Sequence, residues 1–314
     1  MILIAELCQN HNGDFDLLKK MAYSAKESGA DYVKIQTIFA DMLAFRERFE
    51  EGIVENGVTK SIKRPYKDEY DRLKKLELTF KQQKEFINFC YEIDIKPLTT
   101  AFTCDSISKI KEIGFEDIKI ASYDCSSVPL LEKLKGNFDN IFLSTGATYD
   151  DEILSAIKIL ENSNFWLLHC VTIYPTPLNQ FNLSRMQFLS KFTSKVGWSD
   201  HSLVKKDGVK GTIAAIYYGA QVIERHYTIQ GSEMSKDGPV SIGPEDLKEL
   251  KLASLLSKPE LENYLEEKYP DFSETFGSSD RNLSKLELLN RDYFRGRFAN
   301  IDSKGNIIYN WEFK

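Results

Sequence analysis

Eight short apolar runs recur along the chain, separated by longer amphipathic segments. Each run is apolar nearly throughout, which is typical of parallel strands that are covered on both faces. The pattern therefore predicts eight buried strands. They comprise Ile2–Leu7, Asp31–Gln36, Lys96–Thr100, Ile118–Ser122, Asn140–Ser144, Phe165–Cys170, Lys195–Ser199 and Gln221–His226.

Segments with a helical period lie between these runs. Leu17–Ser28 gathers its apolar residues on one face, and Gly29 follows where a helix-terminating residue is expected. Gln82 stands three positions after Thr79, the spacing of a capping box, and this predicts a helix over Thr79–Asp94. Two further helices are predicted over Asp151–Glu161 and Val209–Tyr218.

The alternation of strands and helices predicts a (β/α)8 TIM barrel over residues 1–257. A doubly wound open sheet fits less well, because its first strand–helix turn would carry a G-x-G-x-x-G sequence and none occurs. The charged segment Ala40–Glu77 interrupts the rhythm, and we expect a long loop on the face that carries barrel active sites. Residues 258–314 form a predicted C-terminal extension, in which Lys258–Glu287 is helical or irregular and Asn290–Lys314 forms short alternating strands.

Composition is that of an ordinary globular protein, with 42% hydrophobic and 28% charged residues. The net charge of −6 argues against nucleic acid or an anionic membrane as the main partner. No apolar run reaches the ~18 residues of a membrane span, and the opening apolar run lacks the basic n-region of a signal peptide. The 5 cysteines are odd in number and show no C-x-x-C spacing, so we expect reduced, mostly buried thiols in a cytoplasmic protein.

All four histidines (His11, His169, His201 and His226) stand at or just beyond the carboxyl end of a predicted strand, where barrel active sites lie. His201 and His226 follow neighbouring strands, so their imidazoles are expected to reach one divalent ion such as Mn, Fe, Co or Zn. Glu6 and Glu224 are carboxylates nearby. The alternative is two structural histidines that hydrogen-bond to carboxylates at the barrel rim.

Lysines and hydroxyl groups form a second candidate cluster at the same strand ends. Burying Lys34 and Lys119 inside a barrel is costly unless an anion neutralises them. Together with a ring of hydroxyls they predict a pocket for phosphate and carboxylate groups; the alternative is a pair of solvated charges at the rim. The accompanying polar residues are Gln36, Thr100, Ser122, Ser144 and Ser199.

Taken in order, the motifs of the chain resemble the N-acetylneuraminate (sialic acid) synthase family, which includes legionaminic and pseudaminic acid synthases. The resemblance covers about residues 2–250. It implies a TIM-barrel enzyme that condenses phosphoenolpyruvate with an N-acylated amino sugar and releases phosphate. The matching segments are Ile4–Glu6, Asn10–Gly13, Ala30–Gln36, Lys119–Ser122, Ser144–Gly146, Leu168–Val171, Tyr174–Pro177, Gly197–His201 and Ile223–Thr228.

The resemblance also implies roles for individual residues. A divalent cation, most often manganese with magnesium or cobalt as alternatives, would be bound by His201 and His226. Glu6, Asp124 and Glu224 are the candidate acid/base or water-orienting carboxylates. Phosphoenolpyruvate would contact Lys34, Thr100, Lys119, Ser122, Ser144 and Ser199, and the remaining substrate-binding candidates are Gln36, Thr172, Tyr174 and Asp237.

Two departures from the family pattern bear on the sugar. Val240 stands where family members commonly have an acid that binds the sugar, and Asp237 is a candidate to replace it. The family usually ends in a small antifreeze-like domain that lends an arginine to the partner subunit of a swapped homodimer. Here only Arg291–Arg297 and a short remainder resemble its beginning. The alternatives are therefore condensation with a different aldose of a surface polysaccharide, or a catalytically silent homologue.

Overall fold

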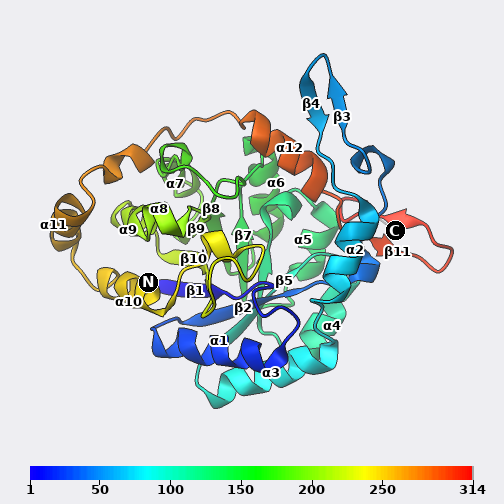
Figure 1. The fold of residues 1–314 in the computed structure, drawn as a ribbon, viewed down its shortest axis with the longest axis horizontal. Helices are drawn as coiled ribbons and strands as arrows, with labels where there is room; N and C mark the ends of the chain where they lie inside the picture. The colour runs from blue at the N-terminus through cyan, green and yellow to red at the C-terminus, as the bar shows by residue number, and fades with distance from the viewer. Residues whose placement is uncertain (313–314) are drawn as a thin grey trace.

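Eight parallel strands close into a barrel in the computed structural model, which describes residues 1–312 (Figure 1). The eight are those expected from the apolar runs, so the predicted TIM-barrel fold is confirmed. In order around the barrel they are β1 (Ile2–Glu6), β10 (Val222–His226), β9 (Val196–Asp200), β8 (Phe165–His169), β7 (Asn140–Ser144), β6 (Asp117–Ile120), β5 (Lys96–Ala101) and β2 (Tyr32–Thr37).

The barrel interior contains an apolar layer with a polar layer above it. The apolar layer is a buried cluster that includes Ile4, Tyr32 and Val222. Side chains two positions apart on a strand share a face, so the next inward residues are Glu6, Lys34, Thr100, Ser144 and Glu224. The strand alternation therefore brings the candidate residues together at the carboxyl end of the barrel.

Helices cover the outside of the barrel. α1 (Phe15–Glu27) starts at Asp14, whose carboxylate accepts from the amides of Asp16 and Leu17. α3 (Phe80–Glu92) begins with the predicted capping box of Thr79 and Gln82. The other covering helices are α4 (Ser106–Ile113), α5 (Val128–Leu134), α6 (Asp150–Leu160), α7 (Arg185–Leu189), α8 (Val204–Asp207), α9 (Lys210–Tyr217) and α10 (Pro244–Ala253).

The segment Ala40–Glu77 is not the plain loop that was expected. It contains two 3-10 turns (Ala40–Met42 and Glu47–Phe49), a hairpin of β3 (Ile53–Glu55) and β4 (Val58–Ser61), and α2 (Tyr66–Lys74). The hairpin turns at Asn56 and Gly57, with φ of 50° and 74°. An Asn-Gly pair with positive φ at both residues is the preferred two-residue hairpin turn, a signal that the reading of this segment as a loop overlooked.

Residues 258–312 run around the barrel, and residues 285–297 lie against α2 and the β3–β4 hairpin (Figure 1). They form α11 (Lys258–Lys268), a 3-10 turn (Phe272–Thr275), α12 (Lys285–Phe294), β11 (Asn300–Ile301) and β12 (Ile307–Ile308). The strand prediction from Asn290 onward was wrong up to Phe294, because a capping box of Ser284 and Glu287 starts a helix that continues to that residue. The last two residues of the expected strand segment, Phe313 and Lys314, lie outside the described residues.

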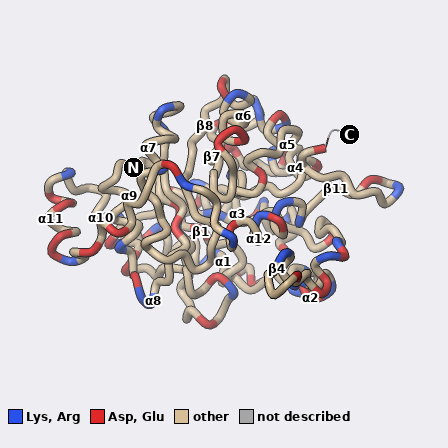
Figure 2. Tube along the Cα trace, turned by 90° about the horizontal axis from the view of Figure 1, so that it is seen from above, with Lys and Arg blue, Asp and Glu red and all other residues tan. Residues whose placement is uncertain are grey.

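Charges of both signs are interspersed over the outer elements of the described chain (Figure 2). Among the described residues, none of the helices has the length and apolar character that a membrane span requires. All five cysteines are buried free thiols, as the sequence predicted.

Candidate active site

Two buried lysines converge on one carboxylate in the polar layer. Lys34 and Lys119 are each 3% exposed. Their Nζ atoms lie 3.9 Å and 4.0 Å from Oε2 of Glu224. Lys34 also forms an ion pair with Glu6 and donates to Thr100 Oγ1 at 2.9 Å. The structure thus brings together side chains from β1, β2, β5, β6 and β10.

Hydroxyl groups complete the surroundings of these charges. Lys119 Nζ donates to Ser144 Oγ at 2.6 Å and to the carbonyl of Ile120 at 2.9 Å. Ser199 Oγ donates to Glu224 Oε1 at 3.0 Å. The predicted cluster of lysines and hydroxyls is therefore a buried network and not a pair of solvated rim charges.

The charges within this network balance, two ammonium groups facing two carboxylates. Burial lowers the pKa of Lys34 to about 8, although Glu224 opposes that shift. Burial alone would raise the pKa of Glu224, but Lys119, Lys34 and the Ser199 hydroxyl lower it to about 2. At neutral pH Glu224 is therefore ionised, and together with Glu6 it offsets the charge of the lysines.

The loop after β7 approaches Ser122 closely. The amide of Gly146 donates to Ser122 Oγ at 3.1 Å, and that hydroxyl lies 2.9 Å from Cys170 Sγ. A Cβ at Gly146 would stand 2.6 Å from the same sulfur, so only glycine fits there. Ser122 is thereby fixed beside the substrate-binding candidates, without a hydrogen bond to either lysine within the described residues.

Potential metal ligands lie next to this network. The rings of His201 and His226 have centroids 5.4 Å apart, and the Nδ1 atom of each is buried without a hydrogen-bond partner in residues 1–312. Burial lowers the pKa of both imidazoles, and neutral imidazole is the form that binds metals. Cys8, His226 and Asp237 offer ligand atoms that all lie within 4.8 Å of one another.

This group differs from the pair predicted from the sequence. His226 is common to both, whereas His201 is not one of the three residues whose ligand atoms converge within the described chain. Asp237 was expected to contact substrate, and sequence reasoning overlooked Cys8, because a cysteine after an apolar strand is usually a small buried hydrophobe. The available signal was that Cys8 lies two residues after Glu6, just beyond the carboxyl end of the first strand.

The candidates for the sugar side lie further out on the rim. Tyr174 is 46% exposed, and its ring centroid lies 4.1 Å from that of His201. Gln36 is partly buried at the end of β2. Val240 is buried, 4% exposed. Tyr174 therefore packs its ring against a candidate metal ligand, with an interplanar angle of 44°.

Asp124 has a different environment from the other two candidate carboxylates. It accepts hydrogen bonds from Asn310 Nδ2 at 3.0 Å and Ser127 Oγ at 3.2 Å. Burial raises its pKa to about 6. Within residues 1–312 it makes no hydrogen bond to Lys34 or Lys119, so the structure does not join it to the lysine network.

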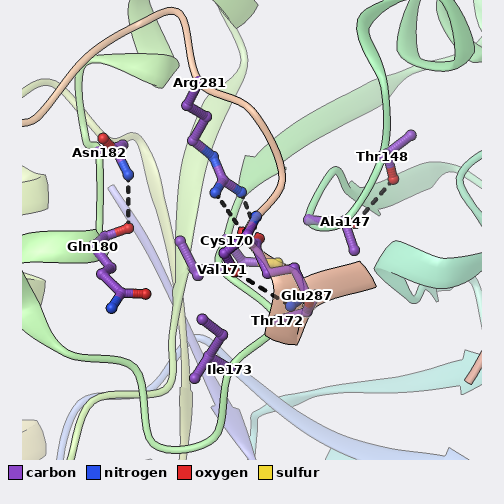
Figure 3. A network of polar contacts seen from close by, with 12 residues as sticks. Ala147, Thr148, Cys170, Val171, Thr172, Ile173, Gln180, Asn182, Arg281 and Glu287 are labelled. Carbon is purple, nitrogen blue, oxygen red and sulfur yellow. Dashed lines mark hydrogen bonds and ion pairs between the residues drawn. The ribbon is translucent and has the colours of Figure 1, made fainter. Parts of the chain in front are cut away.

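The C-terminal residues pack against the loops of the barrel mouth. Figure 3 shows Arg281 pointing toward Glu287 beside Cys170–Ile173, and the two side chains are joined by bonds of 2.8 Å and 2.7 Å. Asn290 Nδ2 donates to the carbonyl of Thr172 at 2.7 Å, while the Thr172 hydroxyl is buried with no partner in the described part of the chain. Arg291 donates to the carbonyl of Ala147 at 2.6 Å. Segments remote in sequence therefore help to shape the rim.

The other two histidines have structural partners. His11 Nδ1 accepts from the Gly13 amide at 3.1 Å, and His169 Nε2 lies 2.8 Å from the carbonyl of Phe181. Burial lowers their pKa values to about 4 and about 3. Position at a strand end alone therefore did not separate candidate ligands from structural histidines.

A barrel with buried cations, carboxylates and potential metal ligands at one rim defines an enzyme-like site for an anionic substrate. The sequence pattern of the NeuB family matches residues 21–258. The chain is 35% identical over 263 residues to N,N'-diacetyllegionaminic acid synthase of Campylobacter jejuni, covering 79% of this chain and 74% of that protein. It is 33% identical over 256 residues to the synthase of the same name from Legionella pneumophila, covering 79% and 69%.

Solved structures agree with these sequence relatives. The N-acetylneuraminic acid synthetase of Leptospira borgpetersenii, solved in complex with citrate, superposes with a TM-score of 0.70 at 28% identity, covering 93% of this chain and 90% of that one. This chain belongs to the NeuB family.

Proposed function

We propose that this protein condenses phosphoenolpyruvate with an N-acylated amino sugar, such as N-acetylmannosamine, to a nine-carbon nonulosonic acid with release of phosphate. The observation that carries the proposal is the convergence of Lys34 and Lys119 on Glu224, next to His226 and its neighbouring ligand atoms. Family membership and the synthase names of its relatives support the same reaction. The enzyme would be a phosphoenolpyruvate-dependent transferase of the alkyl-transfer class (EC 2.5.1).

Phosphoenolpyruvate carries a phosphate and a carboxylate, and both need cationic or hydroxyl partners. Lys34 and Lys119 would bind these anionic groups in a buried setting, where charge-assisted hydrogen bonds are strong. The hydroxyls of Thr100, Ser144 and Ser199 already contact the lysines or Glu224. The substrate would thus enter a network whose donors are oriented before binding, which reduces the cost of reorganisation.

The donors near His226 suit a divalent cation. His201 and His226 would hold it, with neutral imidazole nitrogens that lack protein partners in the structure; we propose manganese, with magnesium or cobalt as alternatives. When bound, such an ion polarises an aldehyde oxygen and stabilises negative charge on it. Tyr174, Gln36 and Asp237 would orient the sugar.

Carbon 3 of phosphoenolpyruvate would use the carbon 2–carbon 3 π pair to bond to the aldehyde carbon. The carbonyl π pair would move to the aldehyde oxygen, which takes up a proton, and positive charge would be left at carbon 2. Water would then add to carbon 2, and a carboxylate would orient it and accept its proton. Glu6 and Glu224 are the candidates within the lysine network, and Asp124 is the candidate outside it. The carbon 2–oxygen bond to phosphate would break as the new hydroxyl at carbon 2 becomes the keto group and passes its proton to the departing phosphate, which the lysines stabilise.

The wider biological context follows from the same proposal. Five free thiols favour a reducing compartment such as the cytoplasm. We propose a homodimer, with no nucleic-acid or membrane partner. We also propose that the barrel domain comprises residues 1–257 and that residues 258–314, a C-terminal extension, resemble part of an antifreeze-like domain.

Phosphate release tests the proposal. Purified protein loaded with Mn²⁺ should release phosphate from phosphoenolpyruvate only when an N-acylated hexosamine is present. A panel of such sugars that yields no phosphate from folded, metal-loaded protein would refute it. Mass spectrometry of the products from a broader aldose panel would distinguish an N-acylated hexosamine from the alternative aldose acceptor that Val240 suggests. A protein that binds no phosphoenolpyruvate in calorimetry would be a catalytically silent homologue.

A further inference from the structure

We propose that Cys8 is a thiolate ligand of the divalent cation, so that sulfur from Cys8 and oxygen from Asp237 join the imidazole nitrogen of His226, with His201 beside them. Asp237 then serves the cation and not the sugar. The inference rests on the proposed function only in assuming that the chain binds a cation. It assigns a role to a residue outside the predicted histidine pair.

The convergence of the three ligand atoms is the first argument. The Cys8 sulfur, an imidazole nitrogen of His226 and a carboxylate oxygen of Asp237 all lie within 4.8 Å of one another. A tetrahedral ion with bonds of about 2.0–2.3 Å keeps its ligand atoms about 3.5 Å apart. Shifts of about 1 Å would therefore close this set around an ion.

Burial without partners is the second argument. Cys8 is 1% exposed and His226 is 7% exposed. The Nδ1 atom of His226 has no hydrogen-bond partner among the described residues, and neither has Nδ1 of the adjacent His201. Buried polar atoms in folded proteins normally have partners, and a bound cation would supply the one that these atoms lack.

The backbone at Cys8 is the third argument. Its φ is 39°, in the left-handed region that glycine occupies without steric cost. The turn is fixed by the Cys8 amide, which donates to Glu6 Oε1 at 2.6 Å. A side chain held in an unfavourable conformation at a functional rim suggests a role for that side chain, and here it directs the sulfur toward His226 and Asp237.

The other cysteines lack such surroundings. Cys90, Cys104 and Cys125 belong to the main hydrophobic core, and Cys170 contacts the Ser122 hydroxyl. A thiolate in the site has a chemical consequence, because sulfur ligands favour Zn²⁺, Co²⁺ or Fe²⁺ over Mn²⁺ and Mg²⁺. Divalent Co and Zn bind most protein sites more tightly than Mn²⁺, so the specific expectation is that this preference is larger in the wild type than in Cys8→Ser.

Cobalt titration of the full-length, metal-free protein tests the assignment. A cysteine sulfur bound to Co²⁺ gives a charge-transfer band in the near ultraviolet, which histidine and carboxylate ligands do not give. We expect this band to saturate at one Co²⁺ per chain in the wild type. Cys8→Gly and Cys8→Ser should lose the band, and Cys90→Ala, a cysteine of the core, should keep it.

Affinity and stability make the test specific. Replacing residues that merely support a ligand commonly costs 10–100-fold in metal affinity, so loss of a direct ligand should weaken Co²⁺ binding by about 100-fold or more. Glycine suits the φ of position 8, which offsets part of the cost of removing this buried side chain. A melting temperature of metal-free Cys8→Gly close to that of the wild type would therefore exclude misfolding as the cause.

Each outcome has a defined meaning. A wild-type protein that binds no Co²⁺, or binds it without the band, would overturn the assignment, as would a band that persists in Cys8→Ser. An active synthase without the band would refute the role of Cys8 and leave the proposed function standing. A protein with the band but without phosphate release on any sugar would refute the proposed function and leave the ligand assignment standing.

Discussion

Lys119→Met removes one of the two cations proposed to bind phosphoenolpyruvate and keeps a side chain of similar length. Lys119 is 3% exposed and donates to Ser144 and the carbonyl of Ile120. Loss of a buried charged partner typically costs about 3 kcal/mol. At 1.36 kcal/mol per tenfold change, kcat/KM for phosphoenolpyruvate should fall by roughly 100-fold.

The same substitution unbalances the network, because Glu6 and Glu224 then face Lys34 alone. We expect the free energy of unfolding to fall by about 1–3 kcal/mol. Lys119→Met combined with Glu224→Gln restores the charge balance and should recover stability without recovering affinity for phosphoenolpyruvate. This separates a binding role from a structural one.

Steady-state phosphate release at saturating sugar gives kcat/KM, and calorimetry gives the affinity for phosphoenolpyruvate directly. Lys84→Met, an exposed lysine on α3, is the matched control and should behave as wild type. A kcat/KM for Lys119→Met within about threefold of wild type, in folded protein, would refute the assignment of the lysine network to this substrate.

Three further predictions concern the rim. Burial raises the pKa of Asp124 from 3.8 to about 6, so the folded protein holds this proton more tightly than the unfolded chain does. The free energy of unfolding should therefore fall by up to about 3 kcal/mol as pH rises from about 4 to about 6. Urea denaturation at several pH values should show a smaller fall for Asp124→Asn, and an equal fall would contradict the argument. Gly146→Ala places a Cβ 2.6 Å from Cys170 Sγ and should lower the unfolding free energy by about 1–3 kcal/mol and weaken phosphoenolpyruvate binding. The control is Gly243→Ala, because φ there is −96° and the nearest atom to an added Cβ is Asp246 Oδ2 at 3.9 Å. Arg46 donates to the carbonyl of Arg295 at 3.1 Å, just after α12. Arg46→Ala should therefore increase the rate of limited proteolysis near α12. An unchanged cleavage rate would show that this contact does not hold the end of α12 in place.

Much of the barrel could be predicted from the sequence because each strand is a nearly continuous apolar run, and a parallel strand buried on both faces requires that pattern. The lysine network was predictable for the same reason. Lys34 and Lys119 interrupt apolar runs, and a charge in such a run needs a buried partner or an anionic ligand. The sequence did not identify Glu224 as the carboxylate between them, which depends on how β2, β6 and β10 are placed around the barrel.

Other features depend on contacts between segments distant in sequence. The group of Cys8, His226 and Asp237 joins residues up to 229 positions apart, from Cys8 to Asp237. The hydrogen bond from Asn310 to Asp124 spans 186 positions. Neither is a periodic signal, and both arise only when the loops after the strands fold over the same rim.

Isotope tracing tests the proposed synthase reaction most directly. Phosphoenolpyruvate labelled with ¹⁸O at the oxygen that bridges carbon 2 and phosphorus should give labelled inorganic phosphate, because the proposed reaction breaks the carbon–oxygen bond. The account predicts that the label appears in phosphate only when an N-acylated hexosamine is converted to a nonulosonic acid. Unlabelled phosphate, or labelled phosphate without a sugar product, would contradict it.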